Sequence, residues 1–222
     1  MVSKEINIVV LILLIFCTST QPTDSSQPKA VFSKNPSALA NVQKINPIIQ
    51  ANLVFASPQN FTGKTLYKNA QCLLHKNAAE KLDLVQKELS KQNLGLLIFD
   101  AFRPLAVQRI LWEANPDERF VANPAKGGGR HTRGTAVDLT LIKLDTKEML
   151  EMPSKVSDFS RCSRDRQDIT PTARKNMLLL ENIMKKHGFV PLASEWWHFD
   201  LADWQNYPAI DLDFDEIEAQ KA

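Results

Sequence analysis

Apolar residues along this chain recur at helical spacing in one stretch and form short continuous runs in others. Between residues 77 and 92 they return every three to four positions, which is the period of an amphipathic helix. These positions are Ala79, Leu82, Val85 and Leu89. Gly95 follows as a stop signal. The pattern therefore predicts a helix over residues 77–92.

Two prolines indicate where two further helices begin. Pro104 suits the first turn of a helix that runs through Trp112, because proline lacks the N–H that a first turn leaves unpaired. Thr170 and Pro171 make an N-cap and first-turn pair for a helix that reaches Lys186. We predict that both segments are helical.

Three short segments have the character of strands. Residues 96–99 are continuously apolar and end at Asp100, residues 135–141 are rich in β-formers, and residues 196–199 are aromatic. These strands do not alternate regularly with the helices, which favours an α+β fold over a parallel doubly wound sheet. We predict a single domain with a small central, mostly antiparallel sheet flanked by helices.

The two ends of the chain differ in composition from the segment that contains the predicted helices and strands. Lys4 precedes a run of apolar residues that is too short to span a bilayer comfortably, so residues 1–20 are interpreted as a signal peptide. Residues 21–45 begin rich in Pro, Ser, Thr and Gln and are predicted to be a flexible leader. The folded domain is then expected at residues 46–210, followed by an acidic, peripheral tail at 211–222.

A signal peptide implies that the protein is exported, to the periplasm or out of the cell. Cys17 leaves an alternative open, because a cysteine that closes such an apolar run can be a lipidation site. Phe16 stands where lipoprotein signals have a small residue, so soluble export is favoured and no stable membrane anchor is expected.

Composition narrows the possible partners. The 222 residues are 44% hydrophobic and 23% charged, which fits one globular domain. The net charge of +2 is too small to favour binding to nucleic acid, and Lys and Arg are spread along the chain.

Cys72 and Cys162 remain after signal removal, and we predict a disulfide between them, with two buried free thiols as the alternative.

The candidate chemistry lies in two clusters. His131 follows three consecutive glycines, and Asp138 falls seven residues later within the predicted strand, on the face opposite Val137 and Leu139. Taken alone, this pair is more typical of an ordinary surface hydrogen bond than of a metal site. Far downstream, Glu195 and His198 flank two tryptophans, where unpartnered polar groups would be costly.

Together the clusters supply two imidazoles and two carboxylates. Three such ligands and one free position for water are the composition of a catalytic zinc site, with the remaining carboxylate available for proton transfer. A structural salt bridge is the competing interpretation. Residues three apart, such as Glu195 and His198, also point to opposite faces of a regular strand, so both reach one site only if the backbone bends there.

These motifs resemble the D-alanyl-D-alanine dipeptidases of the VanX type, a family of zinc D,D-peptidases. The family pattern is Ser-x-His-x-x-Gly-x-Ala-x-Asp, followed later by Glu-x-x-His. Its matching positions here are His131, Gly134, Ala136, Asp138, Glu195 and His198. Further similar segments are residues 60–64, 100–104 and 144–146. One departure is Gly129 in place of the initial Ser, for which Thr132 or Thr135 would have to substitute if that Ser holds substrate.

The resemblance implies a division of roles around one Zn²⁺ per chain in a cleft on the sheet. The implied zinc ligands are His131, Asp138 and His198. Glu195 would be the general base and Arg103 a stabiliser of the developing oxyanion. Asp158 lies in a segment similar to one that contacts the free amino group of the substrate, although a solvated loop Asp is an almost equal alternative.

The implied reaction is hydrolysis of the free dipeptide D-alanyl-D-alanine in cell-wall turnover. One alternative is a D,D-carboxypeptidase or endopeptidase that acts on peptidoglycan stem peptides. A second is a non-catalytic zinc-binding module, which Glu195 argues against because a purely structural zinc site has no need of an unliganded base. His75 and His187 are not assigned to the metal, since His187 falls in the last turn of a predicted helix, where a cation favours the helix dipole. The sequence does not indicate the oligomeric state.

Overall fold

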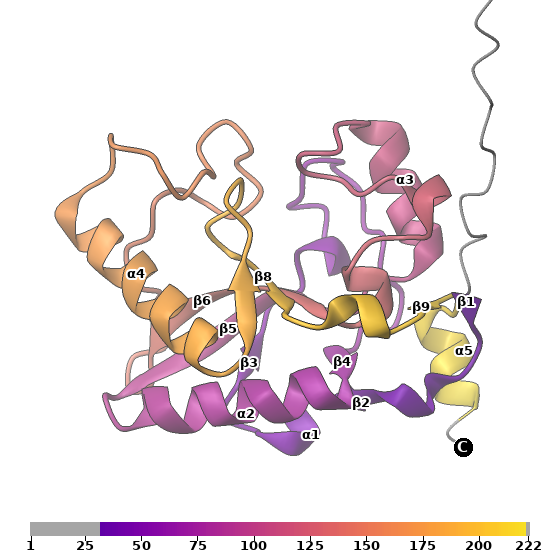
Figure 1. Cartoon of the computed structure of the whole chain (residues 1–222), viewed down its shortest axis with the longest axis horizontal. Coiled ribbons are helices and arrows are strands. Elements are labelled where there is room, and N and C mark those ends of the chain that lie inside the picture. The colour runs from indigo at the N-terminus through magenta and orange to yellow at the C-terminus, as the bar shows by residue number, and fades with distance from the viewer. Residues whose placement is uncertain (1–31, 221–222) are drawn as a thin grey trace, which may run out of the picture.

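A five-stranded sheet forms the centre of the computed structural model, which describes residues 32–220 (Figure 1). In spatial order its strands are β3 (Gln50–Ala51), β5 (Leu94–Asp100), β6 (Ala136–Lys143), β8 (His198–Leu201) and β7 (Phe189–Pro191). The β3–β5 pair is parallel, whereas β5–β6, β6–β8 and β7–β8 are antiparallel. The predicted α+β fold with a mostly antiparallel central sheet is confirmed.

Two long helices cover one face of this sheet (Figure 1). They are α2 (Lys76–Ser90) and α4 (Pro171–Lys186). Both were expected from the sequence, and the Thr170 hydroxyl caps α4 by accepting the Ala173 N–H at 3.0 Å. The core between helices and sheet is mostly apolar, with Leu82, Val85, Leu89, Leu180, Ile183, Met184, Val137, Leu139 and Leu141 among its members. Its burial is the main force that holds the sheet in place.

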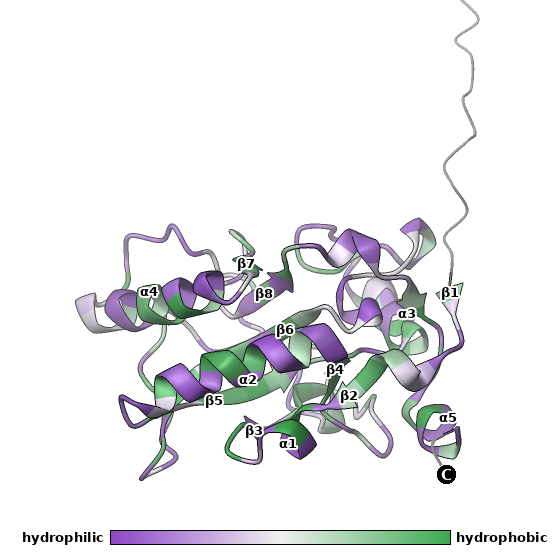
Figure 2. Ribbon diagram, turned by 60° about the horizontal axis from the view of Figure 1, so that its bottom comes forward, coloured by the Kyte–Doolittle hydropathy of each residue, from purple (hydrophilic) through white to green (hydrophobic). Residues whose placement is uncertain are grey.

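Strand β6 has the two faces that the alternation of its residues predicts. Val137 and Leu139 belong to the apolar core, and Asp138 emerges on the side away from α2 and α4. Hydrophobic residues predominate along β5 and β6, as expected for strands in the centre of a sheet (Figure 2). The strand therefore presents one carboxylate to the face that the long helices leave uncovered.

Shorter elements complete the fold. Two small sheets pair β1 (Phe32–Ser33) with β9 (Ala209–Ile210) and β2 (Leu39–Asn41) with β4 (Leu73–His75). The remaining helices are α1 (Val42–Ile45), α3 (Leu105–Ala114) and α5 (Phe214–Ala219). Pro104 is the N-cap of α3 rather than part of its first turn.

The predicted limits of the domain, 46–210, are too narrow. Residues 32–45 of the supposed flexible leader form β1, β2 and α1, because Leu39 and Val42 are buried side chains of the core. The supposed tail contains α5, whose Phe214 packs edge-on against the rings of Tyr67 and Phe102. Burial of these apolar side chains binds both ends to the body of the domain.

The predicted disulfide is wrong. Cys72 and Cys162 are both free and buried, and they belong to separate apolar clusters, one under α2 and the other beside the two tryptophans. Burial raises the pKa of the Cys72 thiol to about 12 and that of Cys162 to about 11. Both therefore act as small, protonated apolar side chains.

The predicted signal peptide and the alternative lipidation site at Cys17 lie outside the described residues. Within residues 32–220, none of the helices combines the length and apolar character that crossing a membrane requires.

The turn before β6 depends on glycine at position 134. Gly134 has φ +68°, and a Cβ there would lie 2.8 Å from the backbone nitrogen of His75 and 2.8 Å from Leu39 Cδ2. We predict that Gly134→Ala lowers the free energy of unfolding by about 2–4 kcal/mol, from the left-handed backbone and the overlap together. Urea denaturation measures this loss.

Gly63→Ala is the matched control for this substitution. Gly63 has nearly the same φ, +67°, but a Cβ there meets no atom within 4 Å. The control should lose only the conformational part, about 1 kcal/mol. Equal losses in the two variants would contradict the close approach at Gly134.

Candidate metal centre

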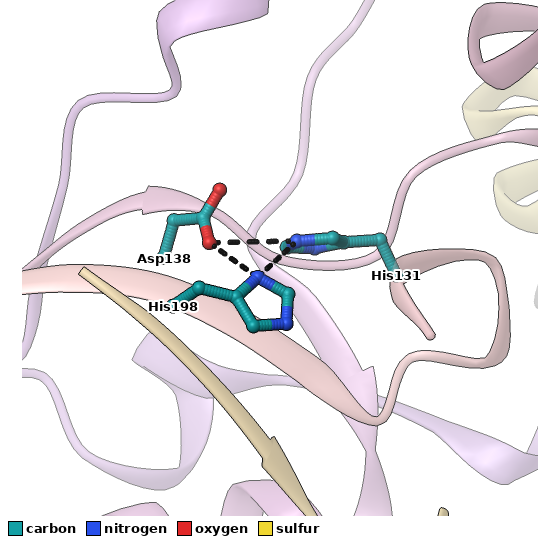
Figure 3. A group of neighbouring side chains, drawn as sticks. All are labelled: His131, Asp138 and His198. Atoms are coloured by element: carbon teal, nitrogen blue, oxygen red, sulfur yellow. Dashed lines mark hydrogen bonds and ion pairs between the residues drawn. The ribbon is translucent and has the colours of Figure 1, made fainter. Parts of the chain in front are cut away.

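Three side chains from two strands and one turn meet on the uncovered face of the sheet. Asp138 of β6 and His198 of β8 are register partners on adjacent strands, so their side chains leave the sheet on the same side. His131 arrives from a 3₁₀ turn, His131–Arg133, that ends just before β6. The three side chains point toward one another (Figure 3).

The spacing of their polar atoms suits one metal ion. His131 Nε2 lies 3.3 Å from His198 Nδ1, Asp138 Oδ1 lies 2.9 Å from His198 Nδ1, and His131 Nε2 lies 3.5 Å from Asp138 Oδ1. A tetrahedral zinc ion with bonds of about 2.0–2.1 Å separates its ligands by roughly 3.3 Å. The predicted ligand set therefore fits zinc in donor type and in spacing.

Each imidazole is oriented by a second contact through its other nitrogen. His131 Nδ1 lies 2.7 Å from the carbonyl oxygen of Ala101, and His198 Nε2 lies 2.9 Å from Asp200 Oδ1. Such outer contacts fix the ring orientation and leave the inner nitrogen free to bind a metal. Asp200 thus supports His198 from outside the group of three.

Charge at the centre also favours a cation. Burial would raise the pKa of Asp138, but His131 and His198 hold it well below its usual range. Burial would lower the pKa of His198, but Asp200 and Asp138 raise it to about 10. Two buried carboxylates thus draw positive charge to this point, and a bound metal ion could supply that charge in place of a proton.

Glu195 lies beside the three ligands without joining them. Its carboxylate Oε2 lies 4.0 Å from His198 Nδ1 and accepts a hydrogen bond from Trp197 Nε1 at 3.0 Å. Burial raises its pKa to about 7. A carboxyl group that gains and loses a proton near neutrality is suited to general acid–base catalysis.

The conflict between strand geometry and the Glu195–His198 spacing is resolved by a bend. Regular strand β8 begins only at His198, and the preceding residues form turns in which the His198 N–H donates to the Glu195 carbonyl at 3.3 Å. Trp196 and Trp197, expected within the strand, lie in this turn and are buried. Both polar side chains can therefore face the same site.

Arg103 is held rigidly at the end of β5. Its Nε and Nη2 donate to Asp100 Oδ2 at 2.9 and 2.6 Å, and its Nη1 donates to Gln108 Oε1 at 2.9 Å. Burial opposes its charge, but Asp100 more than compensates and raises the pKa of the guanidinium. Arg103 is therefore a fixed, permanently charged group with N–H bonds to spare.

One cavity of about 540 Å³ lies at the metal centre. The lining includes the three ligands together with Glu195, Arg103 and Trp197. Apolar walls are added by Phe55, Phe61, Phe120 and Phe159. A cavity of this size holds a small ligand and surrounds the polar centre with low-dielectric walls.

The structure does not bring Asp158 to this cavity. Its neighbours Ser157 and Phe159 contribute to the lining, but Asp158 does not, and its carboxylate accepts a hydrogen bond from the Ser160 hydroxyl at 2.6 Å. The structure therefore places the Asp158 carboxylate outside the lining of the cavity, contrary to the predicted role in substrate binding.

Gly129 also lines the cavity, and the hydroxyls expected to replace a Ser there are engaged elsewhere. Thr132 donates to the Gly129 carbonyl at 2.6 Å, and Thr135 donates to the Arg130 carbonyl at 3.1 Å. A Cβ at Gly129 would lie 3.1 Å from the Ala122 Cβ. Ala122 would therefore have to shift slightly to admit a side chain at Gly129.

Comparison with known proteins identifies the family. A family model described as D-ala-D-ala dipeptidase matches residues 36–217, which include every residue of the centre. The chain belongs to the D-alanyl-D-alanine dipeptidase family. The resemblance seen in the sequence motifs is confirmed.

Several D-alanyl-D-alanine dipeptidases are similar over most of their length. The protein of Escherichia coli K12 is 38% identical over 173 residues, which cover 78% of this chain and 89% of that one. That of Enterococcus faecium is 32% identical over 72% of this chain and 89% of its own. Among solved structures, the LdcB LD-carboxypeptidase covers 83% of this chain and 78% of its own at 16% identity and a TM-score of 0.44, which is a loose likeness.

Proposed function

We propose that this protein is a zinc-dependent dipeptidase that hydrolyses free D-alanyl-D-alanine. The observation that carries the proposal is the group formed by His131, Asp138 and His198, with ligand atoms at zinc spacing and Glu195 beside them in a cavity. The similar proteins of E. coli and E. faecium are named for this dipeptide.

The three ligands would hold one Zn²⁺ per chain. When bound, zinc acts as a Lewis acid that polarises the scissile carbonyl and activates water. His131 is fixed by the 3₁₀ turn before β6, Asp138 by its place in β6, and His198 by its hydrogen-bonded contact with Asp200. The fold and these contacts therefore hold the three ligand side chains in place.

Glu195 is proposed to move the proton of the reaction. Its carboxylate takes a proton from the attacking water, and it returns that proton to the amine nitrogen as the C–N bond breaks. The products are two molecules of D-alanine. The Trp197 indole N–H holds the carboxylate in position, and burial keeps its pKa near 7, so the group can serve in both directions.

Arg103 is proposed to stabilise the negative charge that develops on the carbonyl oxygen. A guanidinium keeps its charge throughout the reaction and offers a planar array of donors. Asp100 and Gln108 engage three of its N–H bonds and fix its plane, which leaves donors for the cavity that it borders. No reorganisation of Arg103 is then needed during the reaction.

The decisive comparison is between D-alanyl-D-alanine and a stem pentapeptide that ends in the same two residues. We expect zinc-loaded protein to release D-alanine from the dipeptide with a kcat/KM at least tenfold higher than from the pentapeptide. Cleavage of the pentapeptide but not of the dipeptide would contradict the proposal and support a D,D-carboxypeptidase or endopeptidase instead. Measurement of D-alanine by a coupled oxidase assay distinguishes the two.

We also propose that the protein is exported after removal of residues 1–20 and recycles D-alanine from the wall. The support is the short apolar run at the N-terminus of the sequence. N-terminal sequencing of the mature protein tests this proposal. A mature chain that still begins at Met1 would contradict it, and a lipid on Cys17 would indicate the alternative route.

A further inference from the structure

The loop of residues 129–135 carries the metal ligand His131 and four other polar side chains, most of which are engaged. Thr132, Arg133 and Thr135 all donate hydrogen bonds to backbone carbonyls. Arg130 differs from them, because it lines the cavity and its side chain is 37% exposed. Within residues 129–135, Arg130 is therefore the cationic group available to a ligand.

The guanidinium of Arg130 is anchored on one side. Its Nε lies 3.3 Å from Asp200 Oδ2, and its Cζ lies 4.9 Å from the centre of the Trp204 ring. Within residues 32–220 its terminal nitrogens donate no hydrogen bond that meets ordinary distance and angle limits, whereas the other arginine of the loop, Arg133, does. The terminal N–H groups, with which an Arg binds a carboxylate, are therefore free in the anchored guanidinium.

We infer that Arg130 binds the C-terminal carboxylate of the peptide substrate. The inference rests on the proposed dipeptidase function and deepens it. In a dipeptide this carboxylate belongs to the residue directly after the scissile carbonyl, and consecutive Cα atoms lie about 3.8 Å apart. Arg130 directly precedes His131 in the chain and contacts Asp200, which in turn contacts His198. Arg130 also lines the same cavity as the three ligands, so a dipeptide whose scissile carbonyl lies at the metal centre can extend its carboxylate toward Arg130.

The same contacts allow a second role, in which Arg130 merely holds Asp200 and so steadies His198. The two roles differ in one respect that can be measured. A carboxylate contact discriminates between a substrate with a charged C-terminus and one without, whereas a positioning role affects both substrates equally.

The experiment compares D-alanyl-D-alanine with its C-terminal amide, D-alanyl-D-alaninamide. For the unmodified protein we expect kcat/KM to be about ten- to a hundredfold higher for the free acid, the range of one charge-assisted contact. Arg130→Ala should lose this preference by slowing the acid alone. Arg119→Ala is the matched control: Arg119 also borders the cavity, but Asp117 engages its guanidinium, and the preference should persist.

Binding provides a readout that is independent of turnover. In the Glu195→Gln protein, calorimetry should detect tighter binding of the acid than of the amide, and adding Arg130→Ala should equalise the two affinities. Equal loss on both substrates in Arg130→Ala, or equal affinities before that substitution, would overturn the inference. If the unmodified protein cleaves neither compound, the proposed hydrolysis fails while the calorimetry still decides the carboxylate contact.

Discussion

Glu195→Gln is expected to lower kcat for D-alanyl-D-alanine by about a thousandfold, within the range for removal of a general acid–base group. Glutamine keeps the size and polarity of the side chain but cannot take a proton from water. Because Glu195 lies outside the group of three ligands, bound zinc should remain at one ion per chain. The measurements are initial rates of D-alanine release and metal content by mass spectrometry.

Glu118→Gln is the matched control for this prediction. Glu118 also borders the cavity, but its carboxylate pairs with Lys126 at 2.6 Å. The same chemical change there should leave kcat within about twofold, as for most surface substitutions. A Glu195→Gln protein that retains zinc and full activity would refute the role of Glu195 as base.

His131→Ala should abolish both zinc binding and hydrolysis. It removes one of three ligands and leaves Asp138 and His198, which are too few for a tight site. Zinc at a hundredfold excess over its dissociation constant stabilises a folded protein by about 2.7 kcal/mol. Thermal unfolding should therefore show a rise in Tm on zinc addition for the unmodified protein and little or none for His131→Ala.

His187→Ala makes the corresponding change away from the centre. His187 caps the end of α4, and its Nε2 lies 2.9 Å from Glu88 Oε2. This variant should keep one zinc, its response to zinc in thermal unfolding, and its activity. If His131→Ala still bound one zinc ion, or if His187→Ala lost it, the assignment of ligands would be wrong.

The metal ligands and Glu195 could be predicted from sequence because they match the motifs of a known family, whereas strand alternation by itself predicted only the placement of Asp138. Val137 and Leu139 identify the buried face of β6, which directs Asp138 to the opposite face. The spacing of Glu195 and His198 could not be interpreted in the same way. Their backbone bends in a turn before β8, and strand periodicity does not predict such a bend.

The residues that support the ligands were missed, although one of them carries a signal. Asp200 follows His198 by two positions on β8, so the period of a strand places both side chains on one face. The carbonyl of Ala101 and the amide of Gln108 carry no comparable signal. Their roles depend on how β5, α3 and the loop before β6 pack together in space.

The ends of the domain and the pairing of the cysteines could not be predicted, because both depend on contacts between residues far apart in the sequence. Strands as short as β1 and β9 are stabilised by each other across the fold, and neither has a pattern that stands out alone. The even number of cysteines that the predicted signal cleavage would leave suggested a disulfide, but counting says nothing of distance. Cys72 and Cys162 are instead buried in different parts of the core.

Titration of metal-free protein with zinc, followed by the rate of D-alanyl-D-alanine hydrolysis, tests the central claim most directly. Chelated protein should be inactive, and activity should rise in proportion to added zinc and level off at one equivalent per chain. This result would show that the reaction requires one zinc ion per chain, as expected for a single site formed by His131, Asp138 and His198. Full activity after chelation, or no hydrolysis with one zinc bound per chain, would contradict it.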